Sequence, residues 1–126
     1  MITEDYLMRQ IEIIARTLAK LLFDKDSPVY IIEDYQILNE TDVIHNNLID
    51  LIDKGNIDKA ENLLFDKIDE ELENNPDGRE YLEIAIDFYA RLNDLDTKFL
   101  DSCGFEREEI NDGLNEVSEL YGISIL

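Results

Sequence analysis

The sequence contains one cysteine and one histidine among 126 residues. Cys103 has no second cysteine with which to form an internal disulfide, which favours a reducing compartment such as the cytoplasm. The five glycines are scattered singly, so no glycine-rich phosphate-binding loop is present. The N-terminus lacks the basic segment and apolar run of a signal peptide, and no apolar stretch approaches the roughly 20 residues that span a bilayer. These absences predict a soluble cytoplasmic protein.

Basic residues are also scarce, since 11 Lys and Arg face 31 Asp and Glu, for a net charge of -20. Residues 1–25 contain four basic and four acidic side chains, so residues 26–126 carry the whole excess. A body this acidic repels phosphates and anionic membranes, so we expect no direct nucleic-acid partner and no membrane partner. The first interpretation of the charge is solubility. The alternative is an acidic mimic or inhibitor that occupies a basic groove of a partner.

Apolar residues recur at helical spacing along most of the chain, which predicts an all-α fold. The first helix is expected over residues 3–23, capped by Thr3. A basic stripe should lie on another face of this helix, where it complements the acidic remainder or a second copy of the chain. The expected buried positions are Leu7, Ile11, Ile14, Leu18 and Leu21 or Leu22, and the basic stripe consists of Arg9, Arg16 and Lys20.

Residues 41–73 predict a helical hairpin, in which Thr41 caps the first arm and Gly55 lies in the connecting turn. Asn74, Asn75 and Pro76 end the second arm, and Asp77 can cap a fourth helix. A short helical piece ending at Gly104 and a last helix over residues 106–121 follow. We therefore expect one domain, residues 1–126, built as a compact bundle of five or six helices.

Residues 29–38 are ambiguous, because they fit either an extended segment over the core or a short helix that reaches Leu38. Strand partners are absent elsewhere in the pattern, so helical or irregular structure is favoured. The aromatic and aliphatic residues of this segment form a partner-binding patch in one interpretation and cover the protein's own core in the favoured one. The residues concerned are Tyr30, Ile31, Tyr35 and Leu38.

The few residues suited to catalysis do not form a recognisable set. His45 falls beside the packed face of the hairpin, where it can pair with Asp42, but a nucleophile–base–orienter set has no third member. Cys103 has acidic neighbours and no nearby positive charge to activate a thiolate. Carboxylates share helix faces, but the single histidine cannot supply a di-iron site, and two short Asp-x-Asp segments lack the glycine and glutamate of a calcium loop. We expect no catalytic, metal or cofactor site.

The sequence resembles two known families. Gly55, Ala60 and Leu64 have the spacing of a tetratricopeptide hairpin, although Leu48 replaces a usual small residue and the second arm is too long. The run from Glu4 to Leu22, with the closing Leu120-Tyr121-Gly122-Ile123, resembles a family of small uncharacterised bacterial proteins, a domain of unknown function found mainly in anaerobic Gram-positive bacteria. This resemblance implies a helical fold, a bacterial cytoplasmic origin and no known activity.

The sequence therefore predicts a non-catalytic protein-interaction or scaffold domain that can self-associate. The acidic mimic is the alternative, and an enzyme is the class with least support. The expected partner is a protein, either another chain or a second copy.

Overall fold

The computed structural model describes residues 3–124, and all regular structure in this range is helical. The six helices of the described chain confirm the predicted all-α class and helix number. They are α1 (Glu4–Phe23), α2 (Glu40–Asp53), α3 (Ile57–Asn74), α4 (Glu80–Asn93), α5 (Thr97–Ser102) and α6 (Arg107–Leu120).

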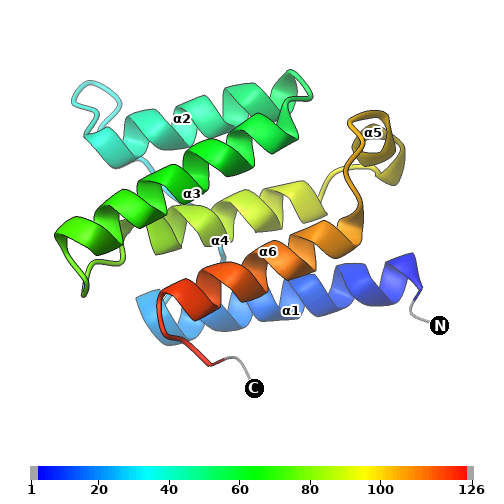
Figure 1. The fold of residues 1–126 in the computed structure, drawn as a ribbon, viewed down its shortest axis with the longest axis horizontal. Coiled ribbons are helices and arrows are strands. Elements are labelled where there is room, and N and C mark those ends of the chain that lie inside the picture. Colours follow the sequence, from blue (N-terminus) through cyan, green and yellow to red (C-terminus); the bar gives the residue numbers. More distant parts are fainter. Residues whose placement is uncertain (1–2, 125–126) are drawn as a thin grey trace.

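Helix α4 forms the centre of the bundle. The α2/α3 pair packs on one side of it and the α1/α6 pair on the other, and each of these four helices contacts α4 (Figure 1). Because α4 is enclosed, it is apolar around most of its circumference, as expected for a buried helix. Its buried apolar residues are Tyr81, Leu82, Ile84, Ala85, Ile86, Phe88, Tyr89 and Leu92.

The apolar face predicted for α1 is largely confirmed. Leu7, Ile11 and Leu18 are buried, with small Ala15 and Ala19 beside them. Ile14 and Leu22, the alternative to Leu21, are half-buried and pack against the core, while 76% of Leu21 is exposed. Only one side of α1 packs against α4 and α6, so a residue on the opposite side has nothing to cover it.

Two of the predicted helix caps are wrong. Asn39, not Thr41, caps α2: its side chain accepts a 3.0 Å hydrogen bond from the backbone N–H of Asp42, and the Asp42 carboxylate accepts one of 3.1 Å from the Asn39 N–H. This reciprocal pair is a capping box, which a single-residue cap at Thr41 cannot provide.

Helix α4 starts at Glu80 and is not capped by Asp77. Instead, the carboxylate of Glu71, on α3, accepts hydrogen bonds from the backbone N–H of Glu80 at 2.9 Å and of Tyr81 at 3.3 Å. A side chain from the preceding helix thus satisfies N–H groups that the first turn leaves free. The same carboxylate accepts a 2.6 Å hydrogen bond from the hydroxyl of Tyr121, beyond α6.

The hairpin predicted over residues 41–73 is present as α2 and α3. Gly55 has a φ of +79°, the left-handed conformation predicted for its turn. Ala60 and Leu64 are fully buried on α3. The hairpin is confirmed, while its tetratricopeptide character remains a prediction.

Residues 24–39 form an irregular loop from α1 to α2, so the alternative of a short helix reaching Leu38 is wrong and irregular structure is confirmed. Within this loop, Ile32 is buried while most other residues are exposed or half-buried. None of the helices in the described part of the chain combines the length and apolarity needed to span a bilayer.

A buried arginine joins the first and last helices of the described chain. Arg107, 3% exposed, donates to the Glu4 carboxylate at 2.6 Å and to the backbone and side-chain oxygens of Asn93 at 2.6 and 3.0 Å. It also donates to the carbonyl of Leu95 at 3.0 Å. Asn93 in turn donates to the carbonyl of Met8, at 2.9 Å. This network ties α1, the α4–α5 turn and α6 together.

Helices α4 and α6 meet at a glycine. Tyr89 is fully buried, and a Cβ placed on Gly113 would lie 2.3 Å from its ring and its hydroxyl oxygen. The hydroxyl donates a 2.6 Å hydrogen bond to Glu61 on α3. Gly113 therefore leaves the space that the tyrosine ring fills.

Gly113→Ala should destabilise the protein by about 1–2 kcal/mol, because overpacking a core costs about 1–3 kcal/mol while alanine's better helix propensity returns up to about 1. Chemical denaturation measures the change, with Asn115→Ala on the exposed side of α6 as the control. A Gly113→Ala protein as stable as the wild type would show that the Tyr89 ring moves aside without cost.

Glu61 gives a pH-dependent prediction. Burial raises the pKa of Glu61, the hydrogen bond from Tyr89 lowers it, and neighbouring carboxylates raise it, with a net increase above the ordinary 4.5. A raised pKa means that the ionised carboxylate opposes folding at neutral pH, and that this penalty disappears below the ordinary pKa. Gln keeps an oxygen that accepts the Tyr89 hydrogen bond.

Glu61→Gln should therefore raise the free energy of unfolding at pH 7, and the gain should shrink towards zero as the pH falls below 4.5. Denaturant titrations across this range test the change. Asp69→Asn, on the exposed face of the same helix and in no ion pair of the described residues, measures the effect of removing one negative charge. An equal gain in the two variants would attribute the effect to net charge alone.

Candidate functional site

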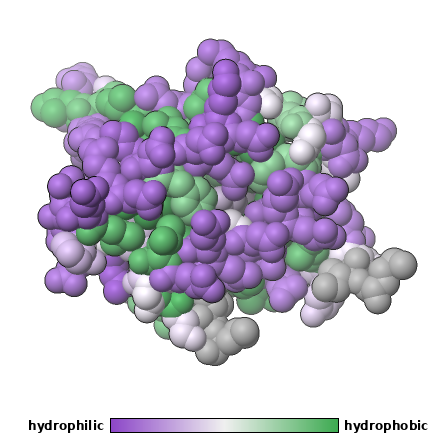
Figure 2. All heavy atoms as spheres, in the orientation of Figure 1, coloured by the Kyte–Doolittle hydropathy of each residue, from purple (hydrophilic) through white to green (hydrophobic). Residues whose placement is uncertain are grey.

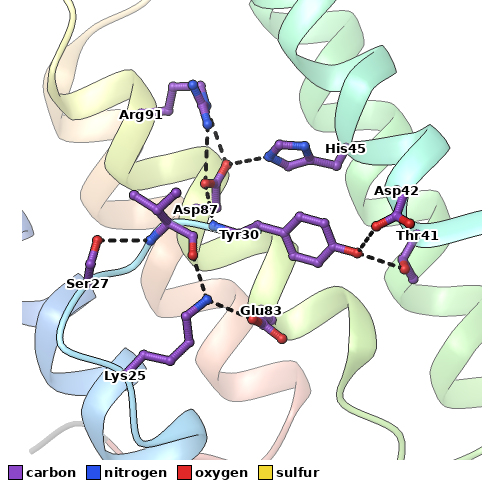
Figure 3. Close-up of polar contacts among 10 residues, drawn as sticks. Lys25, Ser27, Tyr30, Thr41, Asp42, His45, Glu83, Asp87 and Arg91 are labelled. Atoms are coloured by element: carbon purple, nitrogen blue, oxygen red, sulfur yellow. Dashed lines mark hydrogen bonds and ion pairs between the residues drawn. The ribbon is translucent and has the colours of Figure 1, made fainter. Parts of the chain in front are cut away.

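Asp87 on α4 is the centre of a buried polar cluster (Figure 3). It is 3% exposed. His45 Nε2, on α2, lies 3.0 Å from Asp87 Oδ1, and the backbone N–H of Tyr30 donates to Oδ2 at 2.8 Å. Arg91, one turn further along α4, donates to the same carboxylate at 3.3 and 3.4 Å. One side chain thus joins the loop, α2 and α4.

Burial raises the pKa of Asp87. The hydrogen bonds from His45 and the Tyr30 N–H, together with the charge of Arg91, lower it by more, so the net pKa is below the ordinary 3.8. The carboxylate is therefore ionised at neutral pH. Because the pKa is lower in the folded state, the stability that Asp87 contributes is present above pH 3.8 and is lost as the pH falls through the lowered value.

The His45 partner predicted from sequence is wrong, since it is Asp87 rather than Asp42. Asp42 instead accepts a 2.6 Å hydrogen bond from the hydroxyl of Tyr30, which lies 2.9 Å from the hydroxyl of Thr41. The rings of Tyr30 and His45 are 4.8 Å apart. Burial and the Asp42 hydrogen bond raise the pKa of Tyr30 to about 12, so its hydroxyl remains a neutral donor.

A second anchor holds the start of the loop. Lys25 Nζ lies 2.9 Å from Glu83, which is one turn before Asp87 on α4, and it also donates to the carbonyl of Val29 (Figure 3). Tyr30 therefore follows a segment that is attached to α4 at two successive turns. The loop backbone is held at its base by side chains from α2 and α4.

Beyond Tyr30, the loop presents apolar side chains to solvent. Ile31 is 66% exposed, Tyr35 78%, Ile37 76% and Leu38 40%. We call these four residues the loop patch. Green apolar atoms project at the upper left of Figure 2, where Figure 1 places the loop before α2. Of the predicted patch, Tyr30 alone is half-buried and turned inward, and Ile37 joins the set although the sequence analysis did not select it.

The surface around the loop patch is hollowed and acidic. Ile31 and Ile37 line a hollow of about 310 Å³, together with Glu33, Asp34 and Glu83. Neither Glu33 nor Asp34 belongs to an ion pair within residues 3–124. This surface offers apolar contact and uncompensated negative charge side by side.

The predicted basic stripe is exposed along α1. Arg16 lies 3.0 Å from Glu12, and Lys20 lies 3.0 Å from Asp24, while Arg9 forms no ion pair among the described residues. Ile13 lies between Arg9 and Arg16, and Tyr6 lies about one turn before Arg9; they are 65% and 59% exposed. The stripe is therefore both cationic and apolar, which the charge pattern alone did not indicate.

A second cleft, of about 300 Å³, lies between α1, the start of the loop and α4. Arg16 and Arg91 line it, together with Ser27, Asp26 and Asp94. Both arginines already have carboxylate partners in the chain, Glu12 and Asp87. The cleft therefore offers a ligand no cation that is free of a partner in the described structure.

His45 and Cys103 lie in different parts of the molecule. Cys103 Sγ is 3.4 Å from the position of a Cβ on Gly55, in the α2–α3 turn. His45 is ten residues before Gly55, which corresponds to about 15 Å along the axis of α2. Residues 3–124 contain no group of three or more His, Cys, Asp and Glu side chains placed to hold a metal ion.

A family model described as a family of unknown function (DUF6483) matches residues 1–122. The chain belongs to this family. No curated protein and no solved structure matches it. The expected membership of a domain family of unknown function is thus confirmed, and the bacterial origin stays a prediction.

Asp87→Ala should destabilise this family member by about 3 kcal/mol, because removing one partner of a buried ionic cluster leaves the others unsatisfied. The amide of Tyr30 should also lose protection from hydrogen exchange. Denaturant unfolding and exchange measured by NMR test the two effects. Asp50→Ala, which removes an exposed pair with Lys54, is the control and should cost less than about 1 kcal/mol. Unchanged Tyr30 protection would contradict the role assigned to Asp87.

Proposed function

We propose that this domain is a non-catalytic protein-interaction domain whose binding surface is the loop patch. The observation that carries the proposal is the exposure of four large apolar side chains within eight residues of an anchored loop. Single exposed apolar residues are ordinary on protein surfaces. A cluster of them on one segment is typical of an interaction site.

The anchors beneath the loop support this function. Binding orders the side chains and loops at an interface, and that ordering weakens the affinity. Asp87 and Glu83 hold the segment that leads into the loop patch, and Asp42 holds Tyr30 at the base of the patch. A partner therefore meets a backbone that is already restrained at its base.

The surroundings of the loop patch indicate the chemistry of the partner. Ile31 and Ile37 can receive apolar side chains, and Glu33 and Asp34 beside them can receive cations. The net charge of -20 attracts a basic partner over a distance before contact forms. We propose a partner segment that combines Lys or Arg with exposed apolar residues.

Asp87, His45 and Cys103, the residues best suited to catalysis, have structural roles in this proposal. Asp87 is surrounded by three donors from the chain itself, and His45 contacts both Asp87 and the ring of Tyr30. Cys103, the one thiol, packs near the α2–α3 turn. These partners support a role in holding the loop in place.

Tyr35→Ser/Ile37→Ser should remove most of the partner binding without changing stability, because both side chains are more than three-quarters exposed. The tagged protein is used to capture partners from cells of the source organism, and recovery is quantified by mass spectrometry. Losing two apolar anchors should reduce recovery of the true partner about tenfold or more. Leu120→Ser, an exposed apolar residue on α6, is the matched control and should capture as the wild type does.

The same capture, repeated at increasing salt, distinguishes binding through the loop patch from the acidic-mimic alternative. A partner held by charge alone should be lost steeply as salt rises and should be recovered equally by the wild type and the double variant. Equal recovery of every captured protein by the two would overturn the proposed function.

A further inference from the structure

The outward side of α1 is a second exposed surface, with a composition unlike the rest of the molecule. Residues 6, 9, 13, 16 and 20 follow one another at intervals of three and four, so they lie on one face of the helix. We call this set, which consists of Tyr6, Arg9, Ile13, Arg16 and Lys20, the α1 outer face. All five residues are exposed, so α4 and α6 leave this face uncovered.

The charge of the α1 outer face is exceptional in this protein. It holds three of the 11 basic residues, and residues 1–25 sum to zero while the remainder carries -20. The carboxylates near the loop patch therefore repel most of the surface of a second copy, but not its α1 outer face. Charge complementarity thus selects one surface of this chain as an occupant of the loop patch.

Building on the proposed function, we infer that the loop patch receives the α1 outer face of a second copy of this chain. Both surfaces are exposed in the same molecule, so neither covers the other, and contact between them requires two copies. Tyr6 and Ile13 are two helical turns apart, an arrangement of anchors typical of a helix that binds in a groove. Arg9, between them, can face the carboxylates of the hollow. Ile31 and Ile37 line the hollow that receives Tyr6 and Ile13.

The existing ion pairs of α1 do not prevent this contact. Arg16 pairs with Glu12 and Lys20 with Asp24, but these side chains are between 49% and 90% exposed. Exposed pairs contribute about 0–1 kcal/mol, so exchanging partners costs little. Arg9 has no carboxylate partner in the described residues to exchange, and it is free to pair with Glu33 or Asp34 of a second copy.

Overall repulsion between two acidic copies is the opposing effect. At physiological ionic strength the Debye length is about 8 Å, so charges far from the contact are screened and the local complementarity decides the outcome. Because the contact joins two different surfaces, it closes into a reciprocal dimer or continues as a ring or a chain. Sedimentation velocity distinguishes these assemblies.

Two defective variants provide the test. Arg9→Glu/Ile13→Asp disables the α1 outer face, and Tyr35→Ser/Ile37→Ser disables the loop patch. At about 0.15 M salt and over about 1 µM to 1 mM, the wild type should self-associate and each variant alone should remain a monomer. A one-to-one mixture of the variants should regain association, because it pairs an intact α1 outer face with an intact loop patch.

The matched control is Lys59→Glu/Leu120→Asp, which changes one cation and one exposed apolar residue away from both surfaces and should associate as the wild type does. A wild type that stays monomeric at the highest concentration would overturn the inference, as would a mixture of the two defective variants that stays monomeric. If the wild type is monomeric while partner capture still depends on Tyr35 and Ile37, only the self-association fails. If Tyr35→Ser/Ile37→Ser changes neither self-association nor partner capture, both the inference and the proposed function fail.

Discussion

The arrangement of the loop depends on one buried negative charge. An ionised carboxylate inside a protein is tolerated only when hydrogen bonds and opposite charge replace its water. Asp87 obtains these partners from three places: the backbone of Tyr30, the ring of His45 and the guanidinium of Arg91. The requirement to satisfy this carboxylate thus places the base of the loop against α4 and α2. The loop patch is exposed as a consequence, because the segment below it faces inward.

A buried positive charge has the corresponding role at the C-terminal end of α4. Arg107 is surrounded by carbonyl oxygens of the α4–α5 turn and by the carboxylate of Glu4. It fixes the start of α1 beside the start of α6, and the packing of α1 on α4 and α6 leaves its outer face directed to solvent. The two candidate surfaces are therefore positioned by two different buried ions, one at the middle of the central helix and one at its C-terminal end.

Helix periodicity accounts for what the sequence predicted well. The apolar residues of α1 and α3 repeat at helical spacing, and one-sided packing preserves this repeat almost unchanged. The polar clusters were missed because their partners are distant in the chain: Asp87 is 42 residues from His45 and 57 from Tyr30, and Arg107 is 103 from Glu4. His45 was consequently matched with the nearer Asp42. The α4 cap was missed for the same reason, since Glu71 lies on another helix.

The candidate surfaces were only partly predictable. The sequence does not show whether an apolar residue in a loop is buried or exposed. In the structure Ile32 points inward and is buried, while its neighbour Ile31 points outward and is exposed. Ile13 and Leu21 likewise fit a buried stripe by composition, but α1 has no neighbour on that side. The burial of such residues depends on how many helices surround them, which local patterns do not contain.

The hydrogen bond from the Tyr30 hydroxyl to Asp42 joins the two ends of the segment from Ile31 to Thr41. Within this segment, Ile32 is the one buried apolar residue. Side chains from Glu33 to Leu38 can therefore change in type or number while the helices below keep their contacts. The architecture separates the helices that pack against one another from an exposed loop that we propose binds a partner.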